Sequence, residues 1–181
     1  MRENQDREWE NLLTKVTQML ENPRLLPKDL QVKQFSQTLH LWISPTFTPE
    51  KHWVFYAPQP QIEPPPKPVV QQIIWQRETD FQLVMNSVTD FQTEPSFEIK
   101  TIEIDREFYR KIRTELSKIK LSPFVEVEMN GRDGEIFGIE TLDLFYNGRI
   151  VCWSECPNEW QELLDWYEKV RKFLEEKFSE S

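Results

Sequence analysis

Glycine is scarce in this chain. Only four of its 181 residues are glycine, and none of them comes before Gly131. Phosphate-binding loops depend on closely spaced glycines, because these let backbone N–H groups approach the phosphate. No segment here has that spacing. The sequence therefore argues against nucleotide-dependent chemistry, and we expect no cofactor.

Histidine and cysteine are rarer still. The chain contains only His40 and His52, and neither lies near a recognisable nucleophile motif. Cys152 and Cys156 lack the second Cys or His pair of a structural zinc site. We therefore identify no catalytic residue, expect no metal site and predict two reduced thiols.

Long apolar runs are absent. No stretch approaches the roughly 18–20 residues needed to cross a bilayer, and the first eight residues are too charged for a secretory leader. The net charge of −9 argues against a protein that binds nucleic acid or anionic lipid through its overall field. We expect a cytoplasmic protein that binds neither nucleic acid nor membrane.

Aromatic residues, by contrast, are plentiful. Seven Trp, twelve Phe and four Tyr supply large buried areas per residue. A chain of 181 residues fits one domain, in which about 70% of the unfolded surface can be buried. We therefore predict a single domain over residues 1–181 with an aromatic-rich core.

Helical periodicity marks three segments. Apolar residues recur at helical spacing from Trp9 to Leu20, before a stop at Asn22-Pro23. Asp105 is a suitable N-cap for a middle helix, and Pro157 suits the start of a last helix whose apolar stripe runs to Phe178. We predict N-terminal, middle and C-terminal helices.

The remaining patterns favour strands. Alternation predicts two strands within 34–57, and further runs follow at 70–78, 81–88, 97–104 and 124–129. A proline-rich loop is expected at 58–68. The dipeptide Asn147-Gly148 predicts a two-residue hairpin turn that sets Tyr146 opposite Arg149. The fold class is α+β: a mainly antiparallel sheet of six to eight strands, packed on one side by the three helices.

Acidic residues are concentrated near the C-terminus. Residues 123–181 hold fourteen Asp and Glu against six Lys and Arg. Glu126 and Glu128 project from one face of a predicted strand, where Asp143 joins them. Three interpretations stay open: a solvated face, a carboxylate pair for acid–base or metal chemistry, and a docking surface for a basic protein, with Trp166 exposed beside it. We favour a non-catalytic binding protein that engages a basic partner, as immunity proteins and antitoxins do, by physical analogy only.

The alternative is a small-ligand binder or an enzyme with an aromatic-lined pocket between sheet and helices. Its lining would be His40, Trp42, Trp53, Trp75 and Trp153. A third option is structural, because the broad apolar stripe of the C-terminal helix also fits a homodimer seam. Sequence alone does not choose among these hypotheses.

Overall fold

The computed structural model describes residues 2–45, 48–59, 64–86, 93–122, 134–142, 147–153 and 156–181. Within these ranges, six strands form one antiparallel sheet in the order β4-β3-β2-β1-β5-β6. The strands are β1 (Phe35–Pro45), β2 (Lys51–Pro58), β3 (Val69–Trp75), β4 (Phe97–Glu103), β5 (Glu135–Leu142) and β6 (Asn147–Trp153). The helices are α1 (Arg2–Glu21), α2 (Arg77–Asn86), α3 (Arg106–Leu116) and α4 (Gln161–Ser179).

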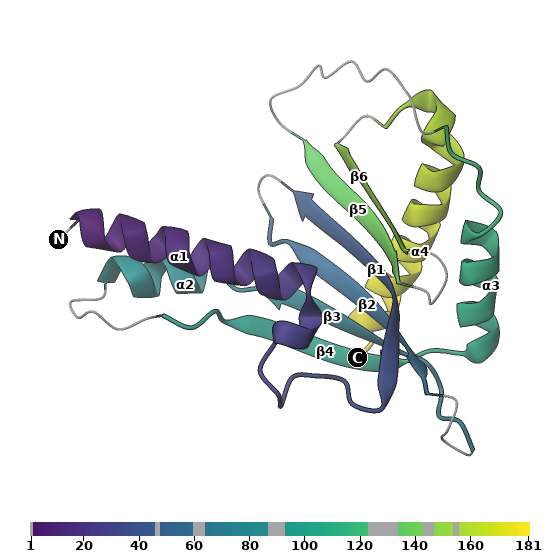
Figure 1. Ribbon diagram of the computed structural model, residues 1–181, viewed down its shortest axis with the longest axis horizontal. Helices are drawn as coiled ribbons and strands as arrows, with labels where there is room; N and C mark the ends of the chain where they lie inside the picture. The colour runs from purple at the N-terminus through teal and green to yellow at the C-terminus, as the bar shows by residue number, and fades with distance from the viewer. Residues whose placement is uncertain are drawn as a thin grey trace.

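The predicted α+β class is confirmed, but the helices lie on both faces of the sheet. Figure 1 shows α3 and α4 on one side and α1 with α2 on the other. The central strands carry apolar residues on both sides: Leu39 and Leu41 of β1 face α3 and α4, whereas Val54 of β2 faces α1. The prediction that all helices cover one side is therefore wrong, because the central strands bury apolar residues on both sides of the sheet.

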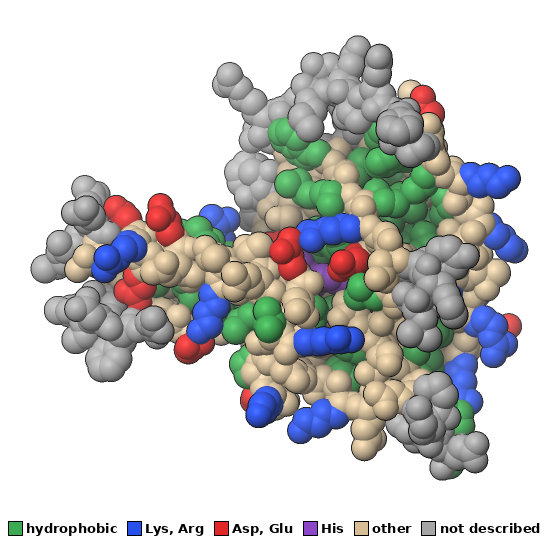
Figure 2. Space-filling model, in the orientation of Figure 1, with side chains coloured by type: hydrophobic (Ala, Val, Ile, Leu, Met, Phe, Trp, Pro, Cys, Tyr) green, Lys and Arg blue, Asp and Glu red, His purple; other side chains and the backbone are tan. Residues whose placement is uncertain are grey.

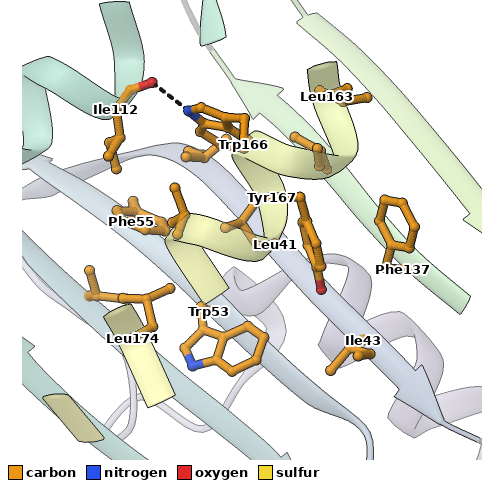
Figure 3. Packing of buried hydrophobic residues seen from close by; sticks show 14 of the residues in the cluster. Leu41, Ile43, Trp53, Phe55, Ile112, Phe137, Leu163, Trp166, Tyr167 and Leu174 are labelled. Atoms are coloured by element: carbon orange, nitrogen blue, oxygen red, sulfur yellow. Dashed lines mark hydrogen bonds between the residues drawn. The ribbon is translucent and has the colours of Figure 1, made fainter. Parts of the chain in front are cut away.

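The face under α3 and α4 forms an aromatic-rich core (Figure 3). Trp53 and Phe55 of β2 lie under Tyr167 of α4, all without solvent exposure. Trp166 is only 5% exposed, and its indole N–H donates to the carbonyl of Ile112 over 3.1 Å. The expected exposure of Trp166 is therefore wrong. The apolar stripe of α4 is buried inside this chain, so a homodimer through this helix would have to use its other faces.

The opposite face has its own core beneath α1. Leu12, Val16 and Leu20 repeat at helical spacing and are each at most 3% exposed. Trp9, one turn earlier, stacks on Trp75 of β3 with ring centroids 5.8 Å apart. The predicted N-terminal helix is thus confirmed, and its apolar stripe faces the sheet as expected.

Residues 81–86 form part of a helix rather than the predicted strand. Val84 is fully buried, and Phe81, three residues earlier, contacts Trp9 edge-on at 5.1 Å. The buried carboxylate of Asp80 accepts from the Trp75 indole N–H at 2.7 Å and from the Ser96 backbone N–H at 2.9 Å. These tertiary contacts stabilise a helix here. They outweigh the weak local alternation that favoured a strand in the sequence.

The pairing of β5 with β6 also differs from the prediction. Glu140 lies opposite Arg149, and Leu142 lies opposite Asn147, so Asn147-Gly148 opens β6 and is not the turn. No described glycine has a positive φ, as the predicted turn would need. On its other edge, β5 pairs with β1 from residue 135 to residue 141. The residues between the two strands, including Tyr146, lie outside the described part.

Cys152 and Cys156 form a disulfide, with Cα atoms 5.7 Å apart. The prediction of two reduced thiols is therefore wrong. The separation is within the usual range for a disulfide. Residue types and compartment arguments do not reveal this proximity.

Candidate functional site

A small polar pocket lies between the C-terminal end of α1 and the sheet. Its volume is about 90 Å³, room for about three water molecules at ~30 Å³ each. Figure 2 shows a histidine side chain at the bottom of a hollow between acidic and basic side chains, near the end of α1. We call it the histidine pocket. It is lined by Thr17, Leu20, Glu21, His40, Trp42, Glu50, His52, Glu140 and Arg149.

Strand register assembles this pocket from residues far apart in sequence. His40 of β1 lies opposite Glu140 of β5, which in turn lies opposite Arg149 of β6. In the next row on the same face, Trp42 lies between His52 of β2 and Gly138 of β5. Side chains two residues apart on a strand share a face, so both rows point toward α1.

The glycine in the second row is required by the tryptophan. A Cβ added at Gly138 would overlap the six-membered ring of Trp42. The indole therefore lies flat over the strand backbone. It leans toward His40, with ring centroids 5.2 Å apart, and forms one wall of the pocket.

The two histidines and two glutamates form a continuous chain. Nε2 of His52 lies 2.9 Å from Oε1 of Glu50, and Nδ1 of His52 lies 2.8 Å from Nε2 of His40. Nδ1 of His40 then faces Oε2 of Glu140 at 3.6 Å. Both imidazoles are buried, whereas Glu50 and Glu140 are about a third and a quarter exposed (30% and 23% of their side chains).

With both imidazoles neutral, this chain of contacts is one proton short. Three contacts link the four residues, but two neutral imidazoles carry only two N–H groups. If His52 donates to the Glu50 carboxylate, its Nδ1 accepts from His40, and Nδ1 of His40 is left without a proton. That atom is one of the buried side-chain atoms that have no hydrogen-bond partner among the described residues. In this arrangement Nδ1 of His40 and the Glu140 carboxylate are both acceptors. The distance between them is also the longest of the three.

Burial keeps His40 neutral. Desolvation, reinforced by His52 and Arg149, lowers the pKa of His40 from 6.5 to about 4, although Glu140 acts in the opposite direction. Near neutral pH the pocket therefore presents a neutral imidazole beside an ionised carboxylate.

Arg149 closes the rim of the pocket. Its guanidinium lies over the Trp42 ring, 5.0 Å from the centroid, and Nη2 is 2.8 Å from Oε1 of Glu21. The side chain thus ties β6 to the end of α1 across the opening. An aromatic face and a carboxylate together hold a cation at this position.

The structure brings together two of the five residues predicted for an aromatic pocket. His40 and Trp42 line the histidine pocket, whereas Trp53 lies in the core on the other side of the sheet. Trp75 shares the face but packs against Trp9, away from the pocket. Trp153 lies on edge strand β6, 36% exposed, opposite Ile136 of β5.

The structure places none of the residues proposed for an acidic docking surface on a described surface. Glu126, Glu128 and Asp143 lie outside the described residues, and Trp166 is in the core. Sequence reasoning also missed the pocket members Glu140 and Arg149. Only the correct pairing of β5 with β1 and β6 would have indicated them.

Comparisons with known proteins add no assignment. No known protein family matches the chain, and no significant similarity connects it to a curated protein or a solved structure. Among the described residues, no three His, Cys, Asp or Glu side chains are placed to hold one metal ion. None of the helices in the described ranges is long and apolar enough to span a membrane.

Proposed function

We propose that the protein is a non-catalytic binding module that receives a cationic group in the histidine pocket. The group is an ammonium, carried either by a small amine or by a lysine of a basic partner protein. Three carboxylates line the pocket, from Glu21, Glu50 and Glu140, against one guanidinium. With His40 neutral, this balance favours a positively charged ligand.

One observation carries the proposal: the buried Nδ1 of His40 has no hydrogen-bond partner and faces Oε2 of Glu140 at 3.6 Å, beyond hydrogen-bond distance. A buried acceptor without a partner costs about 1–3 kcal/mol, so a bound donor there recovers free energy. An ammonium has three N–H donors and a full charge, whereas a hydroxyl offers one donor and no charge. The arrangement therefore fits an ammonium better than a neutral ligand.

The rim of the pocket already holds one cationic side chain. Arg149 already holds its guanidinium between the Trp42 ring and the carboxylate of Glu21. The remaining space of about 90 Å³ is far below the ~300–1,000 Å³ of pockets that enclose a whole metabolite. A ligand larger than a short amine can therefore place only its tip here. A lysine side chain meets that condition, in agreement with the acidic charge of the C-terminal third.

The test uses the fact that the chain has only two histidines. Imidazole nitrogen NMR signals of His40 and His52 can be followed while methylammonium, or separately a short lysine-rich peptide, is added at pH 7.5. We expect a saturable shift of the His40 Nδ1 signal. Saturation by methylammonium alone indicates a small amine, whereas saturation only by the peptide indicates a protein partner.

The variant Glu140→Gln should weaken this binding about tenfold, because the amide removes the charge beside His40. Glu162→Gln is the matched control, since this α4 carboxylate lies outside the pocket lining. A linear, non-saturating shift with both probes contradicts the proposal. Equal weakening by the two variants also contradicts it.

A further inference from the structure

A second concave surface lies on the other side of the sheet, between α3 and the proline-rich connection after β2. Its volume is about 580 Å³. We call it the arginine groove. It is lined by Pro58, Pro65, Pro68, Arg106, Tyr109, Arg110, Arg113, Thr114 and Ser117. Figure 2 shows Lys and Arg side chains along the edge of the molecule where Figure 1 places α3.

Helical spacing gathers three guanidinium groups in this groove. Arg106, Arg110 and Arg113 follow one another at intervals of four and three residues, so they lie on one side of α3. At 1.5 Å per residue, their Cα atoms are about 6 Å and about 4.5 Å apart along the helix axis. The three side chains thus form a row along one wall of the groove.

The outer two arginines are held in place by neighbouring groups. Arg106 donates to the carbonyl oxygens of Pro65 and Pro66, which joins the helix to the proline-rich wall. Nη1 of Arg113 donates to the hydroxyl of Tyr109 over 3.3 Å. Fixing these side chains in advance lowers the entropy that a ligand must remove on binding.

The tyrosine that supports Arg113 is itself anchored. Its hydroxyl donates to Oγ1 of Thr38 on β1 over 2.8 Å. The side chain of Arg110, the middle arginine, is exposed and makes no hydrogen bond or ion pair with any described residue. The row therefore consists of two positioned guanidinium groups with a third one available between them.

The carboxylates of the same helix do not neutralise the row. Asp105 caps α3, accepting from the backbone N–H groups of Glu107 and Phe108. Glu115 pairs with Lys169 of α4 at 2.8 Å. Glu107 is not part of the groove lining. Among the described residues, the groove lining thus contains three guanidinium groups and no carboxylate, on a chain whose net charge is −9.

We propose that the arginine groove binds a small organic anion carrying two oxyanion groups, either carboxylates or phosphates. Guanidinium forks match both groups through paired N–H···O bonds. The volume falls within the range of small-molecule sites. A long polyanion such as nucleic acid would extend beyond the groove into the field of the acidic remainder. This site is independent of the histidine pocket and takes ligands of the opposite charge.

The experiment is calorimetric titration of the whole chain with inorganic pyrophosphate and, in a second arm, with succinate, both at constant ionic strength. We expect saturable one-to-one binding of at least one probe. Tighter binding of pyrophosphate indicates a phosphate ligand, and tighter binding of succinate indicates a dicarboxylate.

A matched pair of variants tests the location. Arg110→Glu should weaken binding at least tenfold, because it places a carboxylate in the middle of the row. Lys111→Glu makes the same change of charge one residue further along α3, outside the groove lining, and should weaken binding less than threefold. Absence of saturation with both probes overturns the proposal. So does equal weakening by both variants, which would reveal only a general field effect.

Discussion

The two faces of the sheet are built from the same strands but differ in what they bury. Under α3 and α4 the buried cluster is almost wholly apolar and aromatic, with Trp53 and Tyr167 at its centre. Under α1 and α2 the sheet buries His40, His52 and Gln71 among its apolar residues. Buried polar groups cost free energy unless they are satisfied, and one nitrogen of His40 is not. The first face thus buries mainly apolar and aromatic side chains, whereas the second also buries ionisable ones.

The largest expected effect comes from breaking the apolar face. Leu174 of α4 has no solvent exposure, so Leu174→Ala should lower the free energy of unfolding by about 4 kcal/mol through lost burial and a cavity. Leu83→Ala is the control, because this side chain is 53% exposed and should cost less than about 0.5 kcal/mol. Urea denaturation measures both. Equal losses would show that α4 does not pack as described.

On the polar face, the largest effect should come from Gly138→Ala. The added methyl group would overlap the Trp42 ring, so the ring must move, and we expect a loss of about 3 kcal/mol. Gly148→Ala is the control, since its Cβ would meet only Oγ1 of Thr141 at an ordinary 3.5 Å. Thermal denaturation compares them. A harmless Gly138→Ala would mean that the indole does not lie over this backbone.

Acid should destabilise the polar face selectively. In the unfolded chain His40 titrates near its ordinary pKa of 6.5, whereas in the folded protein its pKa is about 4. Between these values the unfolded state binds a proton that the folded state does not, so stability falls as the pH decreases through this window and levels off below it. The full loss amounts to about 3 kcal/mol.

Urea midpoints measured from pH 7.5 to pH 4 test this dependence. The variant His40→Gln removes the titrating group and should flatten the curve in that interval. An unchanged slope in the variant would assign the acid sensitivity to other residues.

The smallest effect should come from the rim. Glu21 and Arg149 are both about half exposed, and surface pairs contribute little. Glu21→Gln should therefore cost only about 0.5 kcal/mol by urea denaturation. A loss of several kcal/mol would show that the ion pair contributes strongly to the packing of α1 on the sheet. The face under α1 would then also depend on a surface ion pair for its stability.

Local signals in the sequence predicted most of the helices and strands on the two faces, though not α2. The periodicity of α1 and the N-cap Asp105, which accepts from two backbone N–H groups, were recognisable without tertiary information. Strands β1 and β2 also form where the sequence predicted two strands. These features depend on residues close together in the chain, where side-chain and backbone preferences act directly.

The histidine pocket depends instead on long-range pairing. Glu140 reaches His40 only because β5 pairs with β1, some hundred residues away in sequence. The predicted turn at Asn147-Gly148 implied another register and would have placed Arg149 elsewhere. A register error moves every cross-strand neighbour at once, so sequence reasoning found two pocket residues and missed the charged ones.

The contact between Trp42 and Gly138 also constrains how this protein can evolve. A large side chain at residue 138 becomes acceptable only after the indole has been replaced by something smaller. If the substitution at residue 138 comes first, its side chain overlaps the ring of Trp42 in the intermediate sequence. The two positions therefore form an epistatic pair, and the order in which substitutions arise decides which descendants of this chain are reachable.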